Sequence, residues 1–286
     1  MSAAATTMNR QSEFRFDPAD HAAIGAFVYD EAGIVMPAGK MQLVYGRLAP
    51  RVRASGLTTF ADYIALIERD SGERTRAIDA LTTNHTSFFR EAHHFEHFLD
   101  HAWPALDQRL AARGKVRIWS AACSSGEEPN SLLMAMFGKD RGNGQRLSRT
   151  DLRVLGTDLS TEILAAAEAG RYALDTAAGI PLELRRAWMT RDGDMAEVHP
   201  LLRERCAFRK LNLLEAWPIR GLFDAIFCRN VMIYFDEPTK ERLQSRLADQ
   251  LAPGGFLYIG HSERLSASVA PRFACVGRTT FQKVAA

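Results

Sequence analysis

The sequence predicts an α/β fold, in which a small all-α amino-terminal domain precedes a domain with a mostly parallel sheet. From residue 13 to about 110, apolar residues recur at intervals of three and four residues, which is the spacing of amphipathic helices. After Gly114, short strand-like runs alternate with helix-like runs, as they do in βαβ units. The pair Asp192-Gly193 interrupts this alternation and indicates an inserted antiparallel hairpin.

Length and composition suit two globular units. The chain has 286 residues and a net charge of +2, which is too little positive charge to predict nucleic-acid binding. Its four cysteines are scattered without a C-x-x-C pair, so we expect reduced thiols in a cytoplasmic protein. No apolar run approaches the ~20 residues that span a bilayer, and nothing resembles a signal peptide.

The domain boundaries are predicted from these changes of pattern. Residues 1–12 are small and polar, so we expect a flexible tail. Residues 13–90 form the helical domain with its linker. Residues 91–286 form the second domain, with the antiparallel insertion at about 171–205. We expect a monomer by default.

The helical half contains four amphipathic stretches. Asp17-Pro18 indicates a helix start, and Thr58 or Thr59 is expected to cap the third stretch. Pro50 should kink or interrupt the second. The apolar positions are Ile24, Phe27 and Val28; Leu43, Val44 and Leu48; Phe60, Tyr63, Ile64 and Ile67; and Phe88, Phe95, Phe98 and Leu99.

The second half alternates strands and helices. Right-handed crossovers place the carboxyl ends of parallel strands at one edge of the sheet, where ligands bind. We expect strands at 116–119, 152–156, 223–228 and 256–259, helices at 127–137, 160–169 and 238–251, a polar connection at 139–150, and a turn at Pro253-Gly254-Gly255.

The loop after the first strand, residues 120–129, carries small residues that let a ligand approach the backbone. It has no G-x-G-x-x-G for a pyrophosphate, and its two carboxylates, Glu127 and Glu128, would repel a phosphate. A sulfonium with an α-ammonium and no phosphate fits better, and this describes S-adenosylmethionine. The alternative is that both acids only complement a helix amino terminus.

Asp158 ends the second predicted strand. In nucleotide-binding βαβ units an acid at this place accepts hydrogen bonds from the ribose hydroxyls. The alternative is that Asp158 caps the helix that begins near Ser160. The string Leu251 to Leu257, which contains Pro-Gly-Gly before a late strand, is typical of S-adenosylmethionine methyltransferases.

With these residues assembled, the chain resembles the CheR family of chemotaxis receptor methyltransferases from about residue 13 to its end. Residues 84–91 (NHTSFFRE) resemble the family's N-x-T-x-F-F-R-E, and residues 119–129 resemble its cofactor loop. Asn212-Leu213-Leu214 and residues 223–235 (FDAIFCRNVMIYF) also match. The family usually has Tyr after Glu-Glu-Pro, whereas this chain has Asn130.

The resemblance implies an S-adenosylmethionine-dependent, Rossmann-like methyltransferase domain with a small inserted β-subdomain. It implies methyl transfer to glutamate carboxylates of chemoreceptors, with the receptor's cytoplasmic domain as partner, S-adenosylhomocysteine as product, and no nucleic acid or membrane insertion. It places Arg90 and Tyr234 nearest the transferred methyl. The implied cofactor contacts are Asn84, Thr86, Arg90, Glu128, Asp158, Asn212, Leu213, Arg229 and Asn230.

Simpler interpretations stay open for several of these residues. Arg90 could instead form a structural salt bridge with Glu91 or another neighbouring residue, and Tyr234 could be a packing residue. His93, His97 and His101 share one helix face, but nothing obviously completes a zinc set and methyl transfer needs no metal, so we expect none.

Lys40, Arg47 and Arg51 could form a basic stripe facing the acidic receptor, or only a solvated face. The alternatives to an active enzyme are a CheR-like binding module with poor turnover, and a methyltransferase for nucleic acid or another protein.

Overall fold

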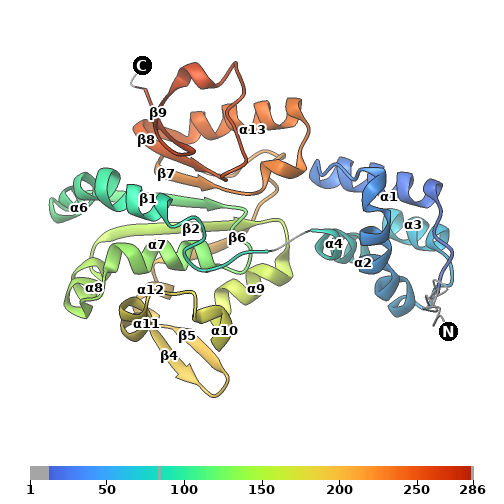
Figure 1. Cartoon of the computed structure of the whole chain (residues 1–286), viewed down its shortest axis with the longest axis horizontal. Coiled ribbons are helices and arrows are strands. Elements are labelled where there is room, and N and C mark those ends of the chain that lie inside the picture. Colours follow the sequence, from blue (N-terminus) through green and yellow to red (C-terminus); the bar gives the residue numbers. More distant parts are fainter. Residues whose placement is uncertain (1–12, 83–84, 285–286) are drawn as a thin grey trace, which may run out of the picture. The chain divides into compact units, whose positions relative to one another are not determined.

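The computed structural model describes residues 13–82 and 85–284, and the chain divides into two compact units, Met1–Thr82 and Thr83–Ala286 (Figure 1). The tail predicted for residues 1–12 lies outside the described residues. Within the described ranges, no helix combines the length and the apolar character needed to cross a membrane.

The first unit is all-α, as the apolar spacing predicts. Asp17 caps its first helix in a capping box with Asp20, and Thr59 caps the third by accepting from the Asp62 N–H. The second helix runs four residues past Pro50, so the expected interruption is wrong. The helices are α1 (Pro18–Ala32), the 3₁₀ turn Ala38–Lys40, α2 (Met41–Ala54), α3 (Phe60–Arg69) and α4 (Ser71–Leu81).

The second unit is built on a sheet with the strand order β6-β2-β1-β7-β8-β10-β9. The first five of these strands run parallel to one another. Strand β10 pairs antiparallel with β8 on one side and with β9 on the other. Ala121 pairs with both Thr157 and Cys228, so β2, β1 and β7 end at one level. The strands are β1 (Lys115–Ala121), β2 (Asp151–Asp158), β6 (Cys206–Lys210), β7 (Phe223–Cys228), β8 (Leu251–Ile259), β9 (Phe273–Gly277) and β10 (Thr280–Lys283).

Helices flank this sheet: α7 and α9 contact β2, and α13 contacts β8 (Figure 1). The stretch containing Phe95 and Phe98 belongs to this unit, because both rings pack against Phe227 of β7. The helices are α5 (His93–His97), the π turn Phe98–Ala102, α6 (Trp103–Ala111), α7 (Glu127–Phe137), α8 (Arg141–Ser148), α9 (Thr161–Ala169), the 3₁₀ turn Met232–Tyr234, α13 (Glu237–Gln250) and the 3₁₀ turn Ala270–Arg272.

A predicted connection and a predicted turn in the second unit have a different structure. The polar connection at 139–150 contains α8, where Gly144 lets the Trp188 ring pack closely; a Cβ there would lie 2.2 Å from the ring. The Pro-Gly-Gly string is an irregularity within β8 rather than a turn before it. Leu251 pairs with Phe223 and Phe256 with Ala225, so the residues between them have no partner across the ladder.

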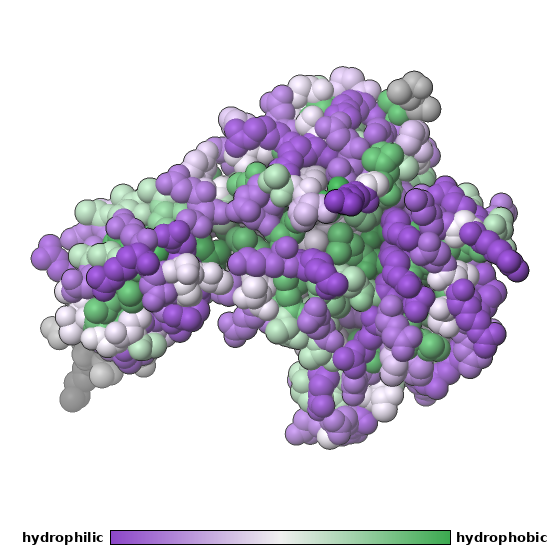
Figure 2. Space-filling view, turned by 180° about the vertical axis from the view of Figure 1, so that it is seen from behind, coloured by the Kyte–Doolittle hydropathy of each residue, from purple (hydrophilic) through white to green (hydrophobic). Residues whose placement is uncertain are grey.

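The inserted segment forms a separate antiparallel sheet with the order β3-β5-β4. The predicted hairpin is confirmed, and Gly193 occupies its turn with φ of 60°. Its far end projects as a mainly hydrophilic surface (Figure 2). The elements are β3 (Arg171–Ala173), α10 (Leu174–Ala177), α11 (Leu182–Trp188), β4 (Met189–Asp192), β5 (Met195–Val198) and α12 (Pro200–Arg203).

Candidate functional site

Strained backbone collects at the carboxyl ends of β1 and β7 and in the segment that precedes α5. Five residues other than glycine have positive φ there: Phe89, Glu91, Ala122, Ser124 and Asn230, with φ between 50° and 60°. Such conformations cost about 1–3 kcal/mol each and persist only where surrounding contacts fix them. Because strained backbone clusters at functional sites, this edge of the sheet is the candidate ligand-binding site.

Asp158, at the end of β2, is 8% exposed and faces the loop after β1. Its carboxylate accepts hydrogen bonds from the Ser124 N–H at 2.8 Å and the Ser160 N–H at 3.1 Å. Burial raises the pKa of Asp158, and these neutral donors only partly oppose the shift. Helix α9 is capped by the Ser160 side chain, so the structure assigns the cap to Ser160. The Asp158 carboxylate keeps lone pairs for a ligand.

Glu128, in the first turn of α7, is held on both carboxylate oxygens. Ser120 donates to Oε1 at 2.7 Å, and Arg229 donates to Oε2 at 3.0 Å. Arg229 is 7% exposed, so this ion pair is largely shielded from water. The neighbouring Glu127 is 4% exposed, accepts from the Ser125 hydroxyl, and has a pKa raised by burial. The two acids therefore differ: Glu128 is fixed by a charge and Glu127 is not.

Arg229 joins the loop after β7 to the segment before α5. Besides Glu128, its guanidinium donates to the Arg90 carbonyl and lies 3.4 Å from Glu91 Oε2. The Arg90 backbone is thus fixed between two residues of positive φ, Phe89 and Glu91. A buried cation placed in this way orients the Arg90 side chain without touching its guanidinium.

The Arg90 side chain is half-buried and donates to the His85 carbonyl at 2.9 Å. It forms no ion pair with any residue that the structure describes. Glu91 turns instead to Arg229, Asn230 and His261, so a structural salt bridge between Arg90 and Glu91 is not formed. A guanidinium in this state is available to a carboxylate.

Glu91 ties three segments of the site together. Its Oε1 accepts from Asn230 Nδ2 at 3.2 Å and lies 3.0 Å from His261 Nδ1. Burial alone would raise the pKa of Glu91, but the hydrogen bonds from His261 and Asn230 and the charge of Arg229 outweigh it and lower the pKa to about 2. Glu91 is therefore ionised at neutral pH.

Glu263 is a buried carboxylate that no motif in the sequence pointed to. It is 5% exposed and accepts backbone N–H groups of Asn230 at 3.2 Å, Gly260 at 2.5 Å and Met232 at 2.8 Å. Gly260 is required there, because a Cβ would lie 2.5 Å from Asn230 Nδ2. Glu263 thus fixes the loop that carries Arg229 and Asn230. The signal that could have found it is a lone acid three residues past a glycine that follows a strand.

Asn130, the departure from the family's usual Tyr, is a bracing residue. Its Nδ2 donates to the Gly126 carbonyl at 2.8 Å and to the Tyr172 hydroxyl at 3.0 Å. The Tyr172 hydroxyl in turn donates to the Ser125 carbonyl at 2.8 Å. The phenol that braces this loop therefore comes from β3, in the inserted segment.

The remaining predicted residues follow β6 and β7 or precede α5. Asn212 follows β6, and its Oδ1 accepts the Leu214 N–H, while Leu213 is buried. The Leu211 N–H donates to the Asp158 carbonyl at 2.9 Å and so holds this loop beside β2. Thr86 and Tyr234 are half-buried, with Tyr234 in the 3₁₀ turn after β7. Asn84 lies outside the described residues.

The three predicted histidines differ in burial and do not form one metal set in the described chain. His97 and His101 lie on one face with ring centroids 4.6 Å apart, and His97 Nδ1 is 3.2 Å from the Tyr258 hydroxyl. His93 is partly buried and His101 is exposed. Of the three, His93 alone belongs to a group of side chains that could bind a metal ion among the described residues, and its neighbours there are Glu91 and His94.

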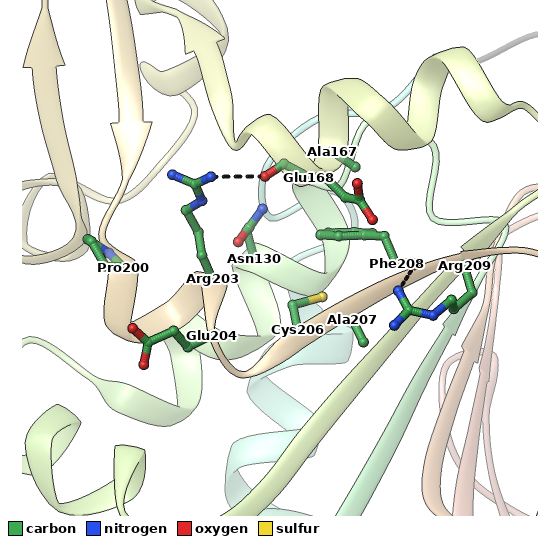
Figure 3. A pocket seen from close by; sticks show the side chains of 10 residues that line it. All are labelled: Asn130, Ala167, Glu168, Pro200, Arg203, Glu204, Cys206, Ala207, Phe208 and Arg209. Atoms are coloured by element: carbon green, nitrogen blue, oxygen red, sulfur yellow. Dashed lines mark hydrogen bonds between the residues drawn. The ribbon is translucent and has the colours of Figure 1, made fainter.

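A cavity of about 420 Å³ lies along β6 and contains none of the predicted site residues (Figure 3). Arg203 crosses it to the Glu168 carbonyl. The other lining side chains include Cys206, Phe208 and Arg209. This cavity borders β6, whereas Asp158, Glu128 and Arg229 lie at or just after the ends of parallel strands.

The donor set at the sheet edge fits a cationic nucleoside without phosphate. Asp158 offers a carboxylate to hydroxyl groups, Glu128 offers one to an ammonium, and the first turn of α7 carries two acids. A phosphate would meet like charge there. S-adenosylmethionine has this combination of groups.

The comparisons with known proteins agree with this chemistry. Residues 84–282 match the family model "CheR methyltransferase, SAM binding domain", and residues 19–82 match "CheR methyltransferase, all-alpha domain". A probable chemotaxis protein methyltransferase of Rhizobium etli is 40% identical over 89% of this chain and 96% of its own length. Chemotaxis protein methyltransferases of Klebsiella aerogenes and Escherichia coli are 41% and 39% identical over 90% of this chain and 87% and 88% of their own lengths. The chain therefore belongs to the CheR family of S-adenosylmethionine-binding chemotaxis methyltransferases.

Proposed function

We propose that this protein transfers the methyl group of S-adenosylmethionine to glutamate side chains in the cytoplasmic domain of chemoreceptors. The products are glutamate γ-methyl esters and S-adenosylhomocysteine. The observation that carries the proposal is Arg90, a half-buried guanidinium that forms no ion pair among the described residues and is fixed through its own backbone. Such a group suits a carboxylate that arrives from outside.

The cofactor is held, in this proposal, by acids at the sheet edge. Asp158 accepts from the ribose hydroxyls, Glu128 faces the ammonium, and Asn212, Leu213 and Thr86 border the adenosine. Asn84 completes this set from the residues that precede Arg90. Arg229 and Asn230 act through Glu128 and Glu91, with which they form the contacts described above.

The methyl group leaves the sulfonium as a carboxylate oxygen bonds to it, and the sulfur keeps the electron pair of the broken bond. A glutamate carboxylate with an ordinary pKa of about 4.3 is ionised at neutral pH, so no general base is required. Arg90 orients the carboxylate, and Tyr234 forms a wall or a hydrogen-bond donor beside the reacting atoms. Correct placement contributes at most about 7–11 kcal/mol to lowering the barrier.

A transfer assay tests the proposal. Purified protein is incubated with tritiated S-adenosylmethionine and receptor-containing membranes, and base-labile methyl counts are measured in the receptor band. We expect Arg90→Ala to abolish these counts and Arg220→Ala, an exposed arginine of the same unit, to retain them. Label only in RNA, or none at all, would overturn the proposed substrate. Full activity of Arg90→Ala would remove Arg90 from the mechanism.

A further inference from the structure

Three side chains that carry metal-binding atoms gather at Glu91, which also pairs with Arg229. Glu91, His93 and His94 each offer one donor atom, and these three donor atoms lie within 4.8 Å of one another. Glu91 Oε2, His93 Nε2 and His94 Nδ1 are buried and have no hydrogen-bond partner among the described residues. Buried polar atoms are rarely left in this state. Glu91 Oε2 also lies 3.4 Å from the Arg229 guanidinium, but that contact leaves the two imidazole nitrogens without a partner among the described residues, and a single cation would serve all three atoms.

The environment of His94 shows what kind of partner is missing. His94 is 0% exposed, and its Nε2 lies 3.2 Å from the Arg278 carbonyl and 3.0 Å from the Thr279 hydroxyl. A carbonyl only accepts, so Nε2 carries the ring proton there. The lone pair of Nδ1 then faces Glu91 Oε2 at 3.5 Å. Two lone pairs facing each other in a buried place favour a cation between them.

We propose that Glu91, His93 and His94 form a binding site for one divalent transition-metal ion of the zinc class. Two imidazoles and one carboxylate are a known zinc donor set that leaves a fourth position for water. The Arg278 carbonyl accepts the Nε2 proton of His94 and so orients the ring, as hydrogen-bond acceptors commonly do for histidines that bind metals. Bonds of about 2.1 Å place tetrahedral donors about 3.4 Å apart, which is close to the 3.5 Å between His94 Nδ1 and Glu91 Oε2.

Such an ion would act as a regulator and not as a participant in methyl transfer. It binds Glu91 Oε2, the atom that lies 3.4 Å from the Arg229 guanidinium, and puts positive charge beside that cation. Arg229 also holds Glu128 and the Arg90 carbonyl. Metal binding therefore loosens the contacts on which the proposed cofactor site depends, and zinc lowers the affinity for S-adenosylmethionine. The metal site itself does not rest on the proposed function.

Cobalt titration of the whole, metal-free protein tests the site. We expect one Co²⁺ per chain, with the intense visible absorption of a four-coordinate ion, displaced by Zn²⁺ but not by Mg²⁺. His93→Gln removes a ligand at a partly exposed position and should weaken binding by about 100-fold or more. His101→Gln, which removes an exposed histidine of the same segment, should bind like the unaltered protein.

Two results would overturn the site: no four-coordinate spectrum in the unaltered protein, or a spectrum and affinity that His93→Gln leaves unchanged. Zinc should also raise the dissociation constant for S-adenosylmethionine in the unaltered protein and not in His93→Gln. A zinc effect of equal size in both proteins would contradict the regulatory role. A failure to bind S-adenosylmethionine at all would instead count against the proposed function, and the cobalt spectrum remains a separate readout.

Discussion

Each unit of the chain buries a carboxylate, and the two are treated in opposite ways. Glu73 in the helical unit is 3% exposed and is surrounded by charge: Arg51 donates to both oxygens, at 2.9 and 2.6 Å, and Arg76 and the Tyr63 hydroxyl add further bonds at 2.8 Å. Asp158 in the methyltransferase unit is 8% exposed and receives only neutral N–H donors.

The pKa values follow this difference. Although burial alone raises the pKa of Glu73, its hydrogen bonds with Arg51, Arg76 and Tyr63 outweigh burial and hold the pKa below its usual value. Burial dominates at Asp158 and raises its pKa. A carboxylate whose charge is fully compensated serves the fold, whereas one held only by backbone dipoles keeps capacity for a ligand.

The largest expected effect comes from Glu73→Gln, which removes the charge that Arg51 and Arg76 compensate. This change leaves the Arg51 guanidinium facing a neutral amide in a shielded place, so we expect unfolding to become easier by about 3 kcal/mol. Urea denaturation measures the loss, and the dissociation constant for S-adenosylmethionine should stay unchanged. Glu68→Gln, at an exposed position of α3, is the control. If the two variants unfold alike, Glu73 does not stabilise the helical unit.

Asp158→Asn should show the reverse pattern. Loss of the charge should weaken the hydrogen bonds proposed between Asp158 and the ribose, and about 2 kcal/mol corresponds to a roughly 30-fold rise in the dissociation constant. Because burial disfavours the charged form, the free energy of unfolding at neutral pH should not fall. Isothermal titration and urea denaturation of the same preparation give both numbers. An unchanged cofactor affinity would contradict the role proposed for Asp158.

Glu263→Gln tests an intermediate case, because Glu263 is held by neutral N–H groups yet is given no ligand. An amide keeps one acceptor oxygen and turns a donor toward the backbone of Asn230 or Met232, at a cost of about 1–2 kcal/mol in stability. Release of the Arg229 loop should raise the cofactor dissociation constant several-fold. Glu162→Gln, exposed on α9, serves as the matched control. Altered stability with unaltered affinity would limit Glu263 to the fold.

The smallest expected effect is a difference in pH dependence. The folded pKa of Glu73 lies below the unfolded value of about 4.3, so its stabilising contribution is present above that value and is lost as pH falls through the folded pKa. The stability gap between the unaltered protein and Glu73→Gln should therefore narrow below about pH 4.5.

Asp158 has a folded pKa above its unfolded value of about 3.9. It therefore reduces stability as pH rises from the unfolded to the folded pKa, and Asp158→Asn should remove that slope. Urea titrations from pH 6 to pH 3.5 measure both trends. Slopes of the same sign for the two variants would remove the distinction between the two carboxylates.

Short-range patterns in the sequence predicted much of the fold and pointed to the candidate site residues. Periodicity predicted α3 and α7, and Asp17-Pro18 predicted the start of α1. Helix α4 was missed because its buried residues, such as Ala77 and Ile78, are few among polar neighbours. Helix α8 was missed because its two glycines resemble a connection, although Gly144 is there to admit Trp188.

Contacts between distant segments could not be predicted in the same way. The pairing of Arg229 with Glu128 joins residues 101 positions apart, and that of Asn230 with Glu91 joins residues 139 apart. The predicted basic stripe is a further example. Arg51 forms an ion pair with Glu73, and Arg47 donates hydrogen bonds to the carbonyls of Leu81 and Thr82. No local pattern shows that these charges are used within the helical unit.

The bond from the Tyr172 hydroxyl to the Ser125 carbonyl bears on how far the chain can be shortened. Tyr172 and Trp188 both belong to the inserted segment, and the Trp188 indole donates to the Gly138 carbonyl at the end of α7. The two ends of α7 are therefore anchored by side chains from outside the parallel sheet. A minimal enzyme made by replacing residues 171–205 with a short linker would lose both anchors. The insertion is thus a structural part of the catalytic core, and a reduced version has to supply a substitute for each of these two rings.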